Sequence, residues 1–117
     1  MDAFILPFTN RPANWGRWPG RINDYLCAGR PIITQSVGEM KILFKEESIG
    51  LTCEESPHAL ADSILKMARS PEQRTLWGKQ ARKLAEGPLD WQTLTIDLHR
   101  AYQKAIEISA EKNKDRL

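Results

Sequence analysis

The chain has 117 residues, of which 41% are hydrophobic, so it is long enough for one small domain with a modest core, or for part of a larger domain. Its formal net charge of +2 comes from 17 basic and 15 acidic side chains of mixed sign. Binding to nucleic acids or to membrane surfaces calls for clustered lysines and arginines, so this balance argues against both classes.

The sequence offers neither an export signal nor a disulfide or zinc framework. The longest strongly apolar run near the start, 3–6, is too short for a signal-peptide core or a membrane span, and we expect a cytoplasmic protein. Cys27 and Cys53 form no C-x-x-C motif and have no second pair that would complete a zinc site. Both cysteines lie among apolar residues, so we expect buried free thiols in a reducing compartment.

Strands alternate with helices along the chain. The apolar runs and turn residues predict strands at 2–7, 31–34 and 48–53, and helices at 20–28, 39–46, 57–68, 71–86 and 91–110. Such alternation is typical of a parallel sheet with right-handed crossovers. We therefore expect an α/β fold: a partial Rossmann-like parallel sheet of three strands, with flanking helices and a helical C-terminus.

Glycine and small polar residues mark the predicted helix ends. Gly29 is expected to end the first helix in the left-handed conformation. Ser56 and Asp90 are placed to cap the helices that follow them. Ser70, with Gln73 three residues later, predicts a capping box.

The C-terminal part of the chain is predicted to be helical with an apolar stripe. Helical spacing there relates Trp91, Leu94, Leu98, Ala101, Tyr102, Ala105 and Ile108. We expect Trp91, Tyr102 and the earlier Trp77 to be core residues. The segment 111–117 is charged, and we expect a frayed tail after a domain spanning 1–110.

The predicted sheet is small, and its first strand begins almost at once, so we expect the chain to be cut from a longer one. Buried parallel strands need neighbours on both sides, and an exposed sheet edge predicts self-association or a partner there. Turns at the carboxyl ends of strands are where α/β sheets bind ligands, and they fall at 9–21, 35–39 and 53–56.

Over nearly its whole length the sequence resembles the C-terminal, donor-binding domain of family-4 glycosyltransferases, which have the GT-B fold. The matching motifs, in order, are Phe4–Pro7, Cys27–Ile33, Thr34–Glu39, Ile49–Leu51 and Pro57–Leu65, followed by a helix that contains Trp91. The resemblance implies that 1–110 binds a nucleotide-diphosphate sugar, whose hexose is then transferred to an acceptor. It implies no metal or other cofactor.

The resemblance assigns roles to residues of the first loop and helix. Asp24 matches the second of two family glutamates and would accept hydrogen bonds from the ribose hydroxyls, a task suited to a carboxylate. The first glutamate, which contacts the donor sugar, would fall at Gly16 and is absent. A branch of the family with Trp-Pro-x-Lys/Arg before the helix is closer, and there Arg17 or Arg21 would face the diphosphate. The helix start at Gly20 would add N–H donors.

Each of these residues also has an ordinary structural interpretation. Asp24 is equally suited to stabilise the start of its helix, and Arg21 is spaced to pair with it. Gly38 is either close to the ligand or part of a plain turn into a helix. Trp18 and Trp15 would either stack on a base or sugar, or cover the sheet.

The resemblance also implies what the chain lacks, namely an acceptor-binding N-terminal domain, supplied by a longer chain or by a partner chain. That absent half would bring any peripheral contact with a membrane, and no nucleic-acid partner is expected. We therefore expect the isolated chain to be inactive. Two alternatives remain open: part of a GT-B-like nucleotide-sugar epimerase, and a non-catalytic nucleotide-binding or interaction module, as half of a split enzyme or as a remnant.

Overall fold

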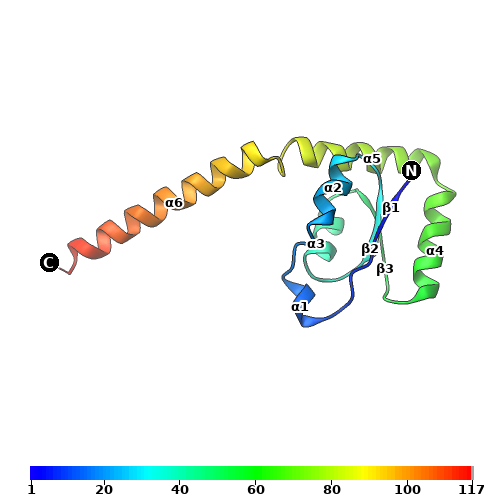
Figure 1. The fold of residues 1–117 in the computed structure, drawn as a ribbon, viewed down its shortest axis with the longest axis horizontal. Helices are drawn as coiled ribbons and strands as arrows, with labels where there is room; N and C mark the ends of the chain where they lie inside the picture. The colour runs from blue at the N-terminus through cyan, green and yellow to red at the C-terminus, as the bar shows by residue number, and fades with distance from the viewer. Residues whose placement is uncertain (117) are drawn as a thin grey trace. The chain divides into compact units, whose positions relative to one another are not determined.

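The computed structural model describes residues 1–116 and confirms the α/β fold, with a parallel sheet, flanking helices and a helical C-terminus (Figure 1). The strands are β1 (Phe4–Leu6), β2 (Ile32–Gln35) and β3 (Gly50–Cys53), and the helices are α1 (Pro12–Trp15), α2 (Arg21–Cys27), α3 (Gly38–Glu46), α4 (Pro57–Ala68), α5 (Pro71–Glu86) and α6 (Trp91–Lys114). The chain divides into two compact units, Met1–Ala85 and the part from Glu86 onward.

The sheet has the order β1-β2-β3, and both pairings are parallel. The register places Ile33 of β2 opposite Ile5 of β1 and Leu51 of β3. All four residues of the central strand β2 are buried. The prediction that the first strand is buried is wrong for Ile5, which is 40% exposed, because β1 forms an edge of the described sheet.

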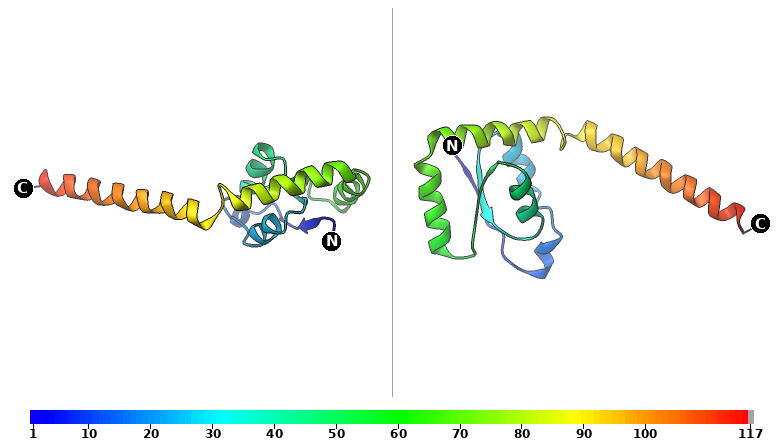
Figure 2. Two further views of the ribbon diagram at one scale, coloured as in Figure 1. Left: turned by 90° about the horizontal axis from the view of Figure 1, so that it is seen from above. Right: turned by 180° about the vertical axis from the view of Figure 1, so that it is seen from behind.

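Helices cover the two faces of the sheet unequally, as Figures 1 and 2 show: α2 and α3 lie on one side and α4 on the other. On the first side the ring of Phe4 stacks on that of Tyr25 in α2, with centroids 4.1 Å apart. On the second side Ile33 and Cys53 cluster with Met67 of α4. Trp77 packs against this cluster and is partly buried, in keeping with its predicted place in the core.

Most of the predicted helix ends are confirmed. Gly29 has a φ of 65°, and the side chains of Ser56 and Asp90 accept hydrogen bonds from Ala59 and Gln92. The predicted capping box is wrong, because the Ser70 hydroxyl instead donates to the Lys66 carbonyl at 2.9 Å. This serine directly follows α4, whose last carbonyls lack partners within the helix and compete for the hydroxyl.

Helix α5 packs along the amino ends of the strands at backbone distance. A Cβ atom on Gly78 would lie 2.5 Å from the carbonyl oxygen of Gly29. A side chain at position 78 would therefore force α5 away from the turn before β2. Arg74 of α5 donates to the carbonyls of Met67 and Ala68 at 2.8 and 2.7 Å, and so satisfies the end of α4.

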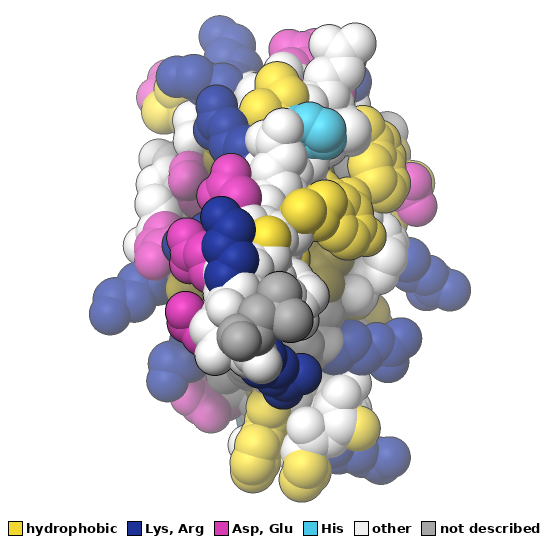
Figure 3. All heavy atoms as spheres, turned by 90° about the vertical axis from the view of Figure 1, so that its left-hand side faces the viewer, with side chains coloured by type: hydrophobic (Ala, Val, Ile, Leu, Met, Phe, Trp, Pro, Cys, Tyr) yellow, Lys and Arg dark blue, Asp and Glu magenta, His cyan; other side chains and the backbone are white. Residues whose placement is uncertain are grey.

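Helix α6 has one apolar side and no buried residue, so the prediction that Trp91 and Tyr102 are core residues is wrong. Trp91 is 82% exposed and Tyr102 is 63% exposed. Figure 3 faces the C-terminal end of this helix and shows hydrophobic and acidic side chains on opposite flanks. Helical spacing shows that one face of a helix is apolar, but it does not show whether another part of the protein covers that face. None of the helices in 1–116 has the length and apolarity needed to cross a bilayer.

The C-terminal boundary drawn from sequence stays a prediction. The helical backbone of α6 continues through the charged segment as far as Lys114, and Leu117 lies outside the described residues.

The two cysteines lie in different surroundings, and the prediction that both are buried is wrong for Cys27. It is the last residue of α2 and is exposed, while its carbonyl accepts a hydrogen bond from Arg82. Cys53 ends β3 and is buried. Burial raises the pKa of the Cys53 thiol above its ordinary value, with Glu54 adding to the rise and a hydrogen bond with Ser63 opposing it.

We expect the two thiols to react with Ellman's reagent in two well-separated phases at neutral pH. Cys27 should react fast because it is exposed, and Cys53 slowly because it is buried and resists ionisation. The Cys27→Ser variant should lose only the fast phase, and unfolding in guanidinium should merge the two. A single fast phase of two thiols in the native protein would contradict this assignment.

Candidate functional site

The candidate site lies at the carboxyl ends of the strands, where parallel α/β sheets bind ligands. The segment after β1, which contains α1, extends beyond this edge in Figure 1, and α5 lies at the opposite, amino edge. The turns after β2 and β3 leave the sheet at the same edge, since the strands are parallel. The three turns predicted from the sequence therefore lie on one side of the unit.

Polar side chains from the neighbouring strand ends hold the loop after β1. The buried Gln35 accepts a hydrogen bond from the Phe8 N–H through Oε1, at 2.6 Å. Glu55, which follows β3, accepts the Asn10 N–H through Oε2 at 2.9 Å. The buried amide of Gln35 needs such a partner, and the partner is the backbone of the loop itself. The loop is thus attached to both neighbouring strands.

Gly38 begins α3 and packs against the same loop. Its φ of +52° is a conformation that side chains rarely adopt. A Cβ atom there would lie 2.7 Å from the Asn14 carbonyl oxygen and would clash with that of Trp15. The structure therefore brings Gly38 against the loop after β1, although a ligand contact at Gly38 stays a prediction.

The first turn of α2 carries three of the predicted residues. Gly20 precedes the helix in helical geometry, and Arg21 and Asp24 are exposed within it. The N–H groups of Ile22 and Asn23 already donate to the carbonyls of Pro19 and Gly20. Fewer free donors are thus available for an anion than the sequence suggested. Within residues 1–116 no ion pair joins Arg21 to Asp24, so their predicted pairing is absent.

Two tryptophans of the loop are exposed, and asparagines hold both. The Trp18 indole is 38% exposed and donates from Nε1 to Asn23 Oδ1 at 3.0 Å, which places it beside the first turn of α2. The Trp15 indole is 56% exposed and donates to Asn10 Oδ1 at 2.8 Å. Arg17 lies exposed between them in sequence.

Sequence reasoning missed the residues that anchor this loop. Gln35 was detectable in principle, because a polar side chain ending a buried strand needs a partner. Asn10, Asn23 and Glu55 carried no comparable signal, since their partners are set by how the loop folds. The roles of Asp24, Arg21, Arg17, Gly20, Gly38 and Trp18 in donor binding stay predictions.

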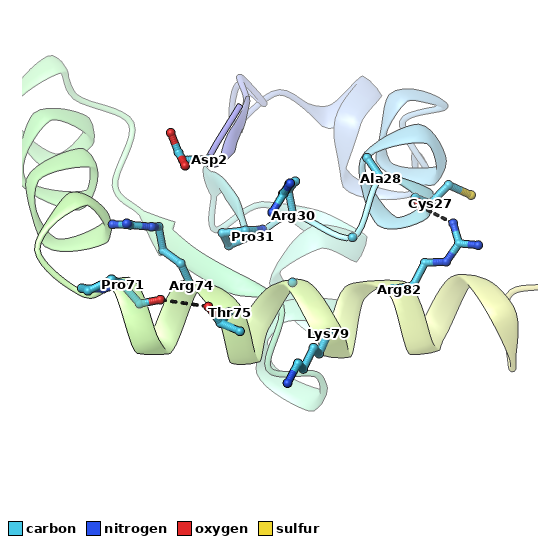
Figure 4. A pocket seen from close by; sticks show the side chains of 12 residues that line it. Asp2, Cys27, Ala28, Arg30, Pro31, Pro71, Arg74, Thr75, Lys79 and Arg82 are labelled. Atoms are coloured by element: carbon cyan, nitrogen blue, oxygen red, sulfur yellow. Dashed lines mark hydrogen bonds between the residues drawn. The ribbon is translucent and has the colours of Figure 1, made fainter.

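A second charged region lies at the opposite edge of the sheet, in a groove of about 660 Å³ (Figure 4). Its lining includes Arg30, Arg74, Lys79 and Arg82, together with Asp2. Arg30 is far from the other three cations in the sequence, and the packing of α5 against the turn before β2 brings all four to one groove. Arg74 and Arg82 already donate to carbonyls at helix ends, so they have a structural role here.

The site offers carboxylate acceptors, guanidinium groups and indole faces. Among residues 1–116 no group of three or more His, Cys, Asp and Glu side chains converges where a metal ion could bind. Asp24 supplies a carboxylate, and Arg17 and Arg21 supply positive charge near it in sequence. Such a set suits a ligand that carries both hydroxyl groups and negative charge.

The fold is shared with part of a solved enzyme. No protein-family model and no curated protein matches the sequence. The structure is similar to that of sucrose-phosphate synthase from Thermosynechococcus elongatus, with a TM-score of 0.77 and 18% sequence identity over 92% of this chain. The matched region is 26% of that enzyme, so the chain spans about a quarter of its length. The likeness shows a common fold for this region.

We expect Gly38→Ala to destabilise the unit by about 1–3 kcal/mol, because the new methyl group meets backbone carbonyls and the residue must hold a positive φ. Gly16→Ala is the matched control. It lies in the same loop with a φ of −106° and open space where a Cβ would be placed, so its unfolding free energy should change little. Urea denaturation of the three proteins makes the comparison, and equal losses for both variants would refute the packing described.

Proposed function

We propose that this chain is the donor-nucleotide-binding part of a glycosyltransferase of the family-4 type, which transfers a sugar from a nucleotide-diphosphate sugar to an acceptor. The observation that carries the proposal is that Asp24 lies exposed in the first turn of α2, the helix that follows the loop at the carboxyl edge of a parallel sheet. The sequence resemblance assigns this position to the ribose carboxylate. The fold shared with a sucrose-phosphate synthase supports the glycosyltransferase class.

The proposed binding mode divides the donor among three kinds of group. The Asp24 carboxylate accepts hydrogen bonds from the two ribose hydroxyls. Arg21, one helical turn before it, and Arg17 in the loop balance the charge of the diphosphate. Trp18, held by Asn23 next to Asp24, provides an apolar surface beside the ribose. No metal enters this scheme, because the guanidinium groups carry the charge compensation.

Nucleotide binding that depends on Asp24 is the expected result. UDP, GDP and ADP are titrated into the purified chain by calorimetry, and the tightest ligand is used further. Asp24→Asn should weaken it about tenfold or more, since hydrogen bonds to a charged group are each worth roughly 1.5–3 kcal/mol. Asp62→Asn, an exposed carboxylate on α4, is the control and should bind normally.

A dideoxy nucleotide sharpens the test. The 2′,3′-dideoxy form of the same diphosphate lacks both hydroxyls, so wild type and Asp24→Asn should bind it equally weakly. An undiminished affinity of Asp24→Asn for the ribonucleotide, or no binding of any nucleoside diphosphate by the wild type, would overturn the proposal.

We further propose that the isolated chain transfers no sugar. Transfer needs the acceptor held against the anomeric carbon, and the proposal assigns that task to a separate acceptor-binding domain. Incubation with radiolabelled nucleotide sugars and a panel of sugar and lipid acceptors should therefore yield no product. Transfer at a rate proportional to the concentration of the purified chain would contradict this.

A second candidate function is that of a binding subunit in a split enzyme. The exposed apolar face of α6 favours it, because such a face is typical of a helix that docks on a partner. The edge strand β1, with its exposed Ile5, is a second place for a partner or for self-association. Sugar transfer restored by adding a separate acceptor-binding chain would favour this candidate.

A further inference from the structure

Two exposed indoles in the loop after β1 are fixed in orientation, and Trp15 is the more exposed of the two. An exposed indole N–H can donate to water, so a protein acceptor is not needed to satisfy it. Trp15 nevertheless donates to Asn10 Oδ1 at 2.8 Å, and Trp18 donates to Asn23 Oδ1 at 3.0 Å. In each case the acceptor is an asparagine five residues away along the chain.

The acceptor of Trp15 is itself tied to the sheet. The backbone N–H of Asn10 donates to Glu55 Oε2 at 2.9 Å, across 45 residues of sequence. Glu55 comes from the turn after β3, so the indole is linked through Asn10 to the carboxyl end of that strand. On its other side, the Trp15 backbone packs against Gly38 at the start of α3. The hydrogen bond to Asn10 therefore holds an indole that is 56% exposed, while the backbone of Trp15 packs against a second element.

We propose that Trp15 is a stacking residue of the ligand site, with Asn10 and Glu55 as its positioning residues; this rests on the proposed function. An indole fixed in this way binds flat ring faces, because its orientation is set before the ligand arrives and less side-chain freedom is lost. The donor carries two such faces, the base and the hexose. Both stack on tryptophan by the same apolar and dispersion contacts.

Trp91 provides the contrast. It is 82% exposed, and within the described residues its indole donates to no side chain or carbonyl. An exposed tryptophan of this chain thus does not need a hydrogen-bond partner within the protein. The hydrogen bonds that link Glu55, Asn10 and Trp15 are therefore a specific feature of this loop. Trp91→Ala is accordingly the matched control for Trp15→Ala.

The binding test uses four probes: the preferred nucleoside diphosphate, its glucose ester, ribose 5-phosphate and pyrophosphate. Trp15→Ala should weaken the nucleoside diphosphate roughly tenfold if the base stacks on the indole. If the hexose stacks on the indole instead, Trp15→Ala should weaken binding of the glucose ester alone, again roughly tenfold. Ribose 5-phosphate and pyrophosphate, which lack a base and a hexose, should bind all variants alike, and Trp91→Ala should match the wild type throughout.

The positioning role has a readout of its own that does not depend on a ligand. Hydrogen exchange of the indole N–H groups, followed by NMR, should be slower for Trp15 than for Trp91. Asn10→Ala should remove this protection, and Glu55→Ala should reduce it. Both variants should also weaken the affected probe several-fold while Trp15 is still present.

The outcomes separate this inference from the proposed function. Normal affinity of Trp15→Ala for all probes, with Asp24→Asn still impaired, overturns the stacking role and leaves the proposed function standing. Equal weakening of all four probes by Trp15→Ala also overturns it, since that result marks a general loss of loop structure. Failure of every nucleotide to bind the wild type overturns both.

Discussion

The hydrogen bond from the Phe8 N–H to the side chain of Gln35 determines where the chain goes after it leaves β1. Gln35 ends the central strand and is buried, so its amide oxygen must find a donor inside the protein. The donor it finds is the backbone of the neighbouring loop, which is thereby aligned with the carboxyl edge of the sheet. The exposed residues of the candidate site lie either in this loop or in α2, the helix to which the loop leads.

The two edges of the sheet differ in how their charged side chains are engaged. At the amino edge, two arginines of α5 donate hydrogen bonds to the carbonyls at the ends of α2 and α4, so their positive charge stabilises the fold. In the loop after β1 and in α2, Arg17, Arg21 and Asp24 stay exposed, and it is the backbone of the loop that is restrained. Charge near a sheet is therefore informative about a ligand only once the structure shows which charges are already engaged.

The sequence predicted the parallel α/β fold and most helix ends because these depend on local patterns: the unbroken apolar run of β2, and the caps at Ser56 and Asp90. It could not predict the exposure of Trp91 and Tyr102, since helical spacing is the same whether or not a partner covers the face. The anchoring of Trp15 was likewise hidden, because it needs Glu55 to arrive from another strand. Long-range contacts of single polar side chains leave no periodic trace.

The contact between Gly29 and Gly78 has a consequence for how this unit can change over evolutionary time. Two backbones meet there with no side chain between them, so even a single added methyl group would push α5 outward and draw Arg74 and Arg82 away from the helix ends they satisfy. Substitution at either glycine is therefore limited by the contact between the two backbones, as it is at Gly38 on the other edge of the sheet.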